Sequence, residues 1–188
     1  DEKHSLNPPD VNGINKLSAE YFHILYQKVY KIKSVILRLT NTYGPAMRIK
    51  DAKQTFLGIW IKQLLENQPI TIFGDGKQIR DFNYIDDCVN ALIIASENKF
   101  AEGKIFNVGS DEKISLTDLA KLMIKVNGGG EFVYKAFPSD REKIDIGDYF
   151  SDISFFKKSL NWTPNFALEK GLKLSLDYFR RNFIYYIN

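Results

Sequence analysis

The first 40 residues constrain the fold most, because they join a helix-length apolar repeat to a short apolar run. Apolar side chains recur at helical spacing through residues 10–30, and two prolines precede them, as is common before a helix. Residues 34–39 then form an almost continuous apolar run, which is typical of a buried parallel strand. A helix followed by such a strand is half of a βαβ repeat, whose first strand would have to lie before residue 1.

The remaining pattern predicts one compact α/β piece without repeats, linkers or low-complexity segments. A loop with a Tyr-Gly-Pro turn is expected at residues 40–51. Asp86 or Asp87 is expected to cap the third helix, Ser115 the fourth and Asp152 the fifth. Beyond the first helix, five more are expected. They run from about 53 to 67, from 86 or 87 to 98, from 115 to the glycines at 128–130, from the cap at 152 to 160, and from 168 to 182. Further strands are expected at 70–73, 80–84 and 105–108.

Charge and cysteine content argue against several classes of protein. The net charge is only +3, and the lysines are scattered along the chain, so no nucleic-acid partner is expected. No apolar stretch approaches the ~20 residues that a membrane helix needs. The single cysteine, Cys88, cannot form an internal disulfide and is expected to be a buried thiol in a reducing compartment, which predicts a cytoplasmic protein.

The chain lacks the glycine pattern that binds the pyrophosphate of a dinucleotide. Such a site needs glycines between a strand and a helix, and the only candidate spacing, at Gly74 and Gly76, lacks the third glycine and leads into a predicted strand. No Walker loop, zinc-ligand spacing or nucleophile elbow is present either, so no metal site is expected. The chain by itself is therefore not expected to form an NAD site.

Four segments, in this order, resemble the extended short-chain dehydrogenase/reductase family. The first two are residues 12–20 (NGINKLSAE) and residues 37–45 (LRLTNTYGP), and the third, strongest one is residues 70–87 (ITIFGDGKQIRDFNYIDD). The fourth combines residues 106–109 with two segments between residues 160 and 172. Each match alone is weak, but their order and spacing cover essentially the whole chain. The chain is thus similar to the carboxyl-terminal portion of an NAD-dependent nucleotide-sugar epimerase or dehydratase, of the UDP-glucose 4-epimerase type.

This resemblance implies a three-layer α/β fold, the carboxyl-terminal part of a Rossmann-type fold with a small α/β substrate-binding domain. Residues 1–40 would be the last helix and strand of the NAD-binding Rossmann domain, whose amino-terminal part is absent, and residues 41–188 would bind the nucleotide sugar. The parent enzyme would use NAD or NADP, bound mainly by the absent part, to oxidise a UDP- or dTDP-linked sugar transiently, followed by epimerisation or dehydration. The chain alone would be inactive, and its first helix would support a homodimer.

The resemblance also assigns catalytic and cofactor positions. Lys16 would contact the nicotinamide ribose and lower the pKa of a catalytic tyrosine, and Thr40 would also lie at the cofactor. The tyrosine belongs one helical turn earlier, where this chain has Asn12. An amide cannot act as a general acid or base. Asn12 therefore leaves three readings open: a subfamily with another acid/base, a chain that binds without turnover, or an engineered change. It would also serve simply as a residue at the start of a helix.

The substrate positions implied by the resemblance surround a diphosphate. Asn41, at a strand end, would hydrogen-bond the sugar diphosphate, and Arg80 would grip it with its bidentate guanidinium. The alternative for Arg80 is an ion pair with Asp75 or Asp81. Arg48 is a candidate for a second contact, and Arg141 is either the replacement for a family arginine or a solvated side chain. Thr71 and Phe73 would line the nucleotide from a strand edge, with a core position as the alternative for Phe73. Thr55 and Phe56 would flank the diphosphate at the start of a helix, a place that favours anions.

Two rival functions remain open. A non-catalytic nucleotide-sugar-binding or regulatory module is favoured by Asn12 and by the missing dinucleotide loop. A sugar-nucleotide decarboxylase of the same family is the other rival. The resemblance favours epimerases over decarboxylases, because decarboxylases tend to carry serine at the position of Asp81.

Overall fold

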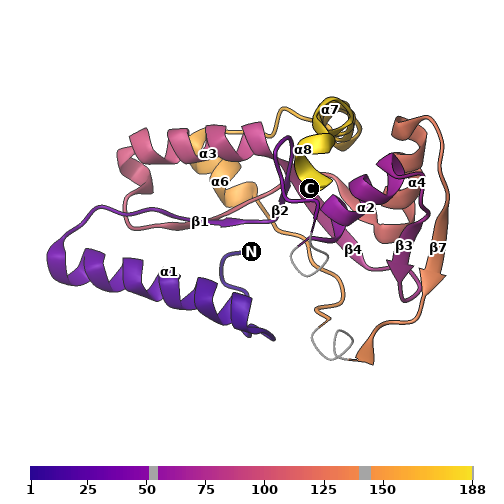
Figure 1. The fold of residues 1–188 in the computed structure, drawn as a ribbon. Coiled ribbons are helices and arrows are strands. Elements are labelled where there is room, and N and C mark those ends of the chain that lie inside the picture. Colours follow the sequence, from indigo (N-terminus) through magenta and orange to yellow (C-terminus); the bar gives the residue numbers. More distant parts are fainter. Residues whose placement is uncertain (51–54, 140–144, 188) are drawn as a thin grey trace.

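The computed structural model describes residues 1–50, 55–139 and 145–187. Its first layer is a parallel pair of strands, β1 (Ile36–Leu39) and β5 (Ile105–Val108), in register from Ile36 with Ile105 to Leu39 with Val108. Figure 1 shows α1 (Val11–Tyr30) on one side of this pair, and α3 (Ile85–Glu97) and α6 (Ser154–Leu160) on the other. This arrangement confirms the expected α/β class with parallel strands between helices.

The rest of the described chain forms two further sheets packed with helices. In one sheet, β4 (Ile79–Tyr84) is parallel to β2 (Asn41–Tyr43) and antiparallel to β6 (Lys113–Ser115). In the other, β3 (Ile70–Phe73) is parallel to β7 (Phe132–Lys135). The remaining helical elements are α2 (Phe56–Leu65), the 3₁₀ helix η1 (Lys99–Ala101), α4 (Leu116–Asn127), α7 (Leu168–Asn182) and α8 (Ile184–Ile187).

Two hydrophobic cores correspond to these layers. The larger core lies among α2, α4, α7 and the strands β2 to β4, and it includes Tyr43, Phe82 and Leu172. The smaller core joins α3, β5 and α6 through residues such as Phe106 and Trp162. Burial of apolar area at about 25 cal/mol per Å² drives the formation of both cores. The strands that link the two cores carry several buried polar side chains, which are described below.

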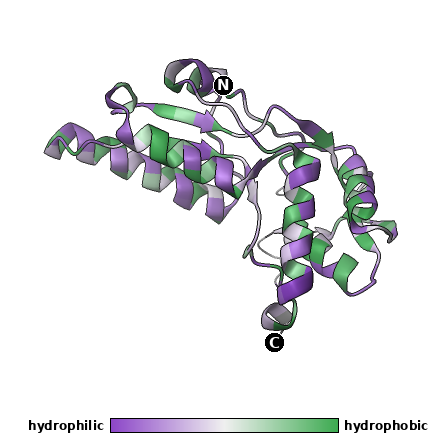
Figure 2. Cartoon of the chain, turned by 90° about the horizontal axis from the view of Figure 1, so that it is seen from above, coloured by the Kyte–Doolittle hydropathy of each residue, from purple (hydrophilic) through white to green (hydrophobic). Residues whose placement is uncertain are grey.

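Helix α7 covers the larger core with one face. Its buried residues recur at helical spacing, from Leu168 to Phe179, and Figure 2 shows hydrophobic and hydrophilic residues alternating along this helix toward the C-terminus. A Cβ atom on Gly171 would lie 2.1 Å from the hydroxyl oxygen of Tyr43. The absence of a side chain at Gly171 therefore lets the helix approach the ring of Tyr43, whose hydroxyl donates to the carbonyl of Leu168 at 3.3 Å.

Most of the expected elements are confirmed. The first helix begins after Asp10, whose carboxylate accepts the N–H of Gly13 at 2.7 Å. Ser115 caps α4 by accepting the N–H of Asp118 at 3.1 Å, and Gly128 ends this helix in the left-handed conformation. These ends are well predicted because each depends on contacts within a few residues. The cap expected at Asp152 was wrong by one position: the N-cap of α6 is Ile153, and the Asp152 carboxylate, one residue earlier, accepts the N–H of Ser154 at 2.8 Å.

Other expectations were wrong where pairing between distant segments decides the structure. Residues 41–43 were expected in a loop but form β2, because they pair with β4, and β6, β7 and α8 were not predicted. Neither Asp86 nor Asp87 caps α3. The run expected to be buried is only partly so, since Leu39 is 41% exposed, and β1 has β5 as its one strand neighbour in the described parts of the chain.

The carboxylate of Asp87 has a different role from the expected cap. It accepts the N–H groups of Asn165 at 2.9 Å and Phe166 at 3.0 Å, and it is buried. This contact fixes the segment that leads into α7 against the start of α3. Cys88, next to it, is buried as expected, and burial raises the pKa of its thiol. No helix within the described ranges is long and apolar enough to cross a membrane.

Candidate functional site

The residues that follow β1 and β5 meet at the side chain of Asp81, which lies within β4. A Cβ atom placed on Gly109, which follows β5, would lie 2.5 Å from Oδ2 of Asp81 and 2.9 Å from Oγ1 of Thr40, which follows β1. The same carboxylate oxygen accepts the N–H of Ser151 at 3.5 Å. Asp81 is 0% exposed, so the carboxylate is enclosed between the carboxyl ends of β1 and β5. This edge of a parallel sheet is where ligands bind in open α/β folds.

Several polar atoms around this carboxylate are buried without a hydrogen-bond partner in the described parts of the chain. They are Oδ1 of Asp81 and both side-chain polar atoms of Asn83. Burial raises the pKa of Asp81, and the N–H of Ser151 and the hydroxyl of Thr40 offset this rise only in part. Buried polar groups without partners are costly. The junction therefore stores an unfavourable electrostatic contribution that the surrounding hydrophobic packing must outweigh.

Asn41 lies directly beside this junction. Its side-chain Nδ2 donates to the backbone carbonyl of Asp81 at 2.9 Å, and its backbone pairs in register with Phe82. The amide is thus held against β4 by a contact between residues 40 positions apart. The structure therefore holds Asn41 against the backbone of β4 at Asp81, and its place in a ligand site together with Arg80 stays a prediction.

Arg80 precedes Asp81 in β4, and successive side chains of a strand point to opposite faces. Its guanidinium donates to the carbonyl of Ile79 at 2.9 Å and to the carbonyl of Gly147. Within the described ranges its ion-pair partner is Asp145, whose carboxylate lies 3.8 Å from Nη2 of Arg80. The alternative ion pair with Asp75 or Asp81 was therefore wrong in its partner, and Asp75 pairs with Lys77 at 3.1 Å instead.

The environment of Arg80 is mostly buried. The side chain is 10% exposed, and burial lowers its pKa, while the negative charges of Asp145, Asp148 and Asp81 act in the opposite direction. Arginine stays charged under these conditions because its ordinary pKa lies far above neutral pH. The site therefore holds a desolvated, permanently positive group in a setting of three carboxylates.

Thr71 and Phe73 lie on β3, away from this junction. The backbone of Thr71 is fastened to α2, since its carbonyl accepts Nε1 of Trp60 at 2.9 Å and its N–H donates to Gln63 at 3.2 Å. Phe73 is 41% exposed, so the alternative of a core position is wrong. Its ring lies 6.1 Å from that of Phe137. Among the described residues, no hydrogen bond or ring contact links Phe73 to Asn41 or Arg80.

The positions around the start of α2 are partly those expected. Thr55 caps this helix by accepting the N–H of Gly58 at 3.4 Å. The ring of Phe56 lies 6.0 Å from that of Phe82 and packs at the margin of the larger core. Arg48 has an exposed side chain, and its backbone carbonyl lies against Gly58. Arg141 lies outside the described residues.

Asn12 and Lys16 occupy successive turns of α1, and both are exposed. The helix is joined to β1 by an ion pair that was not predicted. Arg38 donates to the carboxylate of Glu20 through Nη2 at 2.5 Å and through Nε at 3.0 Å, and to the carbonyl of Glu2 at 2.9 Å. Glu20 and Arg38 both lie in segments that resemble the family pattern. The position of Arg38 within an otherwise apolar strand was the sequence signal that this residue needs an acidic partner.

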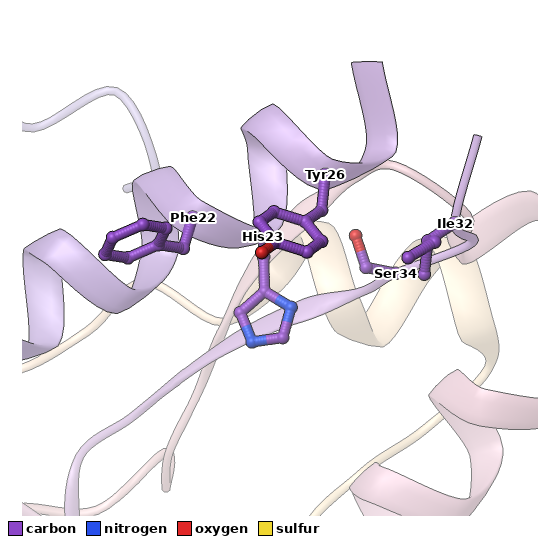
Figure 3. Close-up of a pocket in the computed structure, with 5 residues that line it drawn as sticks. All are labelled: Phe22, His23, Tyr26, Ile32 and Ser34. Carbon is purple, nitrogen blue, oxygen red and sulfur yellow. The ribbon is translucent and has the colours of Figure 1, made fainter. Parts of the chain in front are cut away.

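A pocket of about 380 Å³ lies beside the carboxyl-terminal half of α1. Figure 3 shows that Phe22, His23 and Tyr26 line it from the helix, and Ile32 and Ser34 from the segment that follows. These residues precede β1, whereas Thr40 and Asn41 follow that strand. The pocket is therefore at the opposite end of β1 from the predicted site.

Comparisons with known proteins agree with this architecture. The sequence model of the NAD dependent epimerase/dehydratase family matches residues 1–109. The chain is 33% identical over 177 residues to an uncharacterized UDP-glucose epimerase of Bacillus subtilis, covering 94% of this chain and 54% of the relative. It is 30% identical over 170 residues to a UDP-glucuronic acid decarboxylase of Arabidopsis thaliana, covering 90% and 37%.

The fold is also similar to solved structures. One is a variant of the UDP-glucuronic acid 4-epimerase of Bacillus cereus in complex with UDP-4-deoxy-4-fluoro-glucuronic acid and NAD. The TM-score is 0.85 at 34% identity, and the match covers 97% of this chain and 56% of that chain. The chain thus spans about half the length of the Bacillus subtilis relative and of the Bacillus cereus epimerase.

The enclosure of Asp81 predicts a specific pH dependence of stability. Because its pKa is raised in the folded state, the unfolded chain releases this proton first as the pH rises above the ordinary carboxyl pKa of about 3.9. The unfolded state then binds fewer protons, so the contribution of Asp81 to the free energy of unfolding falls with rising pH until the raised pKa is passed. Asp81→Asn removes this effect, and its stability relative to the wild type should increase from about pH 4 upward.

Urea denaturation of both proteins at several pH values measures this difference. The surface variant Asp177→Asn controls for the loss of one carboxylate. A difference between Asp81→Asn and the wild type that does not change with pH would contradict the assignment.

Proposed function

Because the chain belongs to the NAD-dependent epimerase/dehydratase family, we propose that it forms the nucleotide-sugar-binding half of an enzyme that epimerises or dehydrates a UDP- or dTDP-linked sugar after transient oxidation. The observation that carries this proposal is the position of Asn41, which follows β1 and donates to the backbone carbonyl of Asp81, next to Arg80 in the sequence of β4. The sugars bound by the Bacillus cereus relative support a nucleoside-diphosphate sugar as the ligand.

In this proposal, Arg80 supplies the positive charge that binds the diphosphate. A guanidinium offers five donors in a planar fork, which matches phosphate oxygens better than a lysine does. Asn41 keeps its carboxamide oxygen available while Nδ2 is bound to β4, so it would orient a hydroxyl or amide of the ligand. Thr71 and Phe73 would line the nucleotide from β3, and the exposed ring of Phe73 is suited to stacking on a base.

The residues of this chain fit only one end of the cofactor. Bound NAD or NADP supplies the hydride acceptor for the sugar carbon. Lys16 presents an exposed ammonium on α1, and Thr40 presents a hydroxyl beside Asp81 at the carboxyl end of β1, so both suit the nicotinamide ribose. The turn at Gly74 and Gly76 leads into β4 instead of a helix, which does not fit the pyrophosphate. We propose that residues 1–40 pack on a cofactor-binding part that supplies this site.

A non-catalytic binding module is the second candidate function, and Asn12 is the observation that favours it. The amide stands one turn before Lys16, where the family pattern has its tyrosine, and it cannot exchange a proton with the sugar hydroxyl. A decarboxylase of the same family is a third candidate, supported by the match to the Arabidopsis thaliana relative. Cytoplasmic location stays a prediction that cell fractionation would test.

We expect Arg80→Ala to weaken UDP binding by the complete gene product at least about tenfold, because charge-assisted hydrogen bonds contribute roughly 1.5–3 kcal/mol. Isothermal titration with UDP measures the affinity, and Arg181→Ala, on the exposed end of α7, is the matched control. Circular dichroism confirms that both variants fold. Equal affinities for UDP in Arg80→Ala and the wild type would overturn the role of Arg80.

Restoring the tyrosine separates an enzyme from a binding module. If the site is otherwise competent, Asn12→Tyr should raise the turnover of UDP-glucose with NAD by about 100-fold, since a placed general acid/base contributes 10²–10⁴. Asn12→Phe is the control, because it adds the same ring without the hydroxyl. Turnover is followed by product analysis, and equal rates in the Tyr and Phe variants would count against a catalytic role for this position.

We also propose a homodimer formed through α1. This helix has no buried residue, and large apolar side chains remain exposed along it, among them Phe22, Leu25 and Val29. Contiguous exposed apolar surface of this kind marks an interface. Sedimentation equilibrium of the complete gene product should give twice the mass of one chain, and Leu25→Glu should shift the mass toward one chain. A wild-type protein of single-chain mass would contradict the dimer.

A further inference from the structure

The segment of residues 145–149 lies along the first residues of β4. The N–H of Tyr149 donates to the carbonyl of Ile79 at 2.9 Å, and the N–H of Ile79 donates to the carboxylate of Asp148 at 2.8 Å. A parallel bridge also pairs Tyr149 with Arg80. These contacts hold the segment in place over the guanidinium of Arg80.

The donors of Arg80 are directed at this segment. The guanidinium donates to the carbonyl of Gly147 and lies 3.8 Å from the carboxylate of Asp145. Gly147 has φ +62°, a conformation that glycine adopts without the strain that a Cβ atom causes. The side chain of Asp145 is 28% exposed and that of Arg80 10% exposed, so solvent screens the attraction between the two charges only in part.

A carboxylate and a diphosphate require the same thing from a guanidinium, namely N–H donors and a positive charge. A diphosphate at Arg80 would have to replace Asp145, and the displaced carboxylate would remain a negative charge near the ligand. Like charges placed together in a partly buried site lower affinity. Asp148 is different, because its carboxylate is engaged by the backbone of Ile79 and not by the guanidinium.

We propose that Asp145 sets the affinity of the site for the nucleoside diphosphate by occupying Arg80 in the absence of ligand. This inference rests on the proposed function, since it concerns the same arginine. Residues 145–149 then act as an internal competitor, which an anionic ligand displaces from Arg80 when it binds. Asp145 is thus a residue that determines affinity and anion selectivity, and it takes no part in the chemistry.

The test is titration of the complete gene product with UDP. We expect Asp145→Asn to bind UDP about three- to tenfold more tightly than the wild type, as removal of one partly exposed like charge implies. Asp145→Ala should also bind more tightly, which guards against an effect specific to the amide. Asp177→Asn makes the same change in net charge far along the chain on α7, and its affinity should equal that of the wild type.

The double variant Arg80→Ala/Asp145→Asn identifies the cause of the effect. Without the guanidinium, there is no group to compete for, so the gain from Asp145→Asn should disappear relative to Arg80→Ala. If both Asp145 variants bind UDP with the affinity of the wild type or more weakly, the inference about Asp145 is wrong. The proposed function still holds in that case, provided that the wild type binds UDP. Absence of UDP binding in the wild type and in both Asp145 variants would overturn both.

Discussion

The enclosed carboxylate of Asp81 is the interaction on which the arrangement of this molecule depends. It lies between the residues that follow β1 and β5 and accepts the N–H of Ser151, while its own backbone carbonyl accepts Asn41. Placing a carboxyl group where it is 0% exposed is unfavourable in itself. The two hydrophobic cores on either side outweigh this cost, and the polar contacts fix how the strands meet between them.

Because successive side chains of a β-strand point to opposite faces, the neighbouring residues Arg80 and Asp81 of β4 have different surroundings. Asp81 points into the junction, and Arg80 points the other way, toward residues 145–149. Any shift of β4 by one residue would exchange these two faces and place a guanidinium in the junction. The register of β4 with β2 and β6 therefore determines both the packing between the sheets and the location of the positive charge.

Local signals accounted for much of the fold. Helix α1 and its start at Asp10, the cap at Ser115, the end at Gly128 and the strand of residues 70–73 could all be predicted, because each depends on neighbouring residues. The candidate site was predicted less fully. Asn41 and Arg80 were identified as candidates from the family pattern. The predicted ion-pair partner of Arg80 was wrong, and the ion pair of Arg38 with Glu20 was not predicted. These pairs join segments far apart in the chain, and periodicity does not specify such partners.

The sequence by itself determined most of the helices and several of the strands, where some of them begin and end, and which family pattern they follow. Only the tertiary structure decided that residues 41–43 pair as a strand, that Asp87 binds the segment before α7 instead of capping α3, and that Arg80 faces Asp145. The physical reason is the range of the interactions. Caps and periodic apolar faces depend on residues within one or two turns, whereas a buried charge finds its partners only after both cores have brought distant segments together.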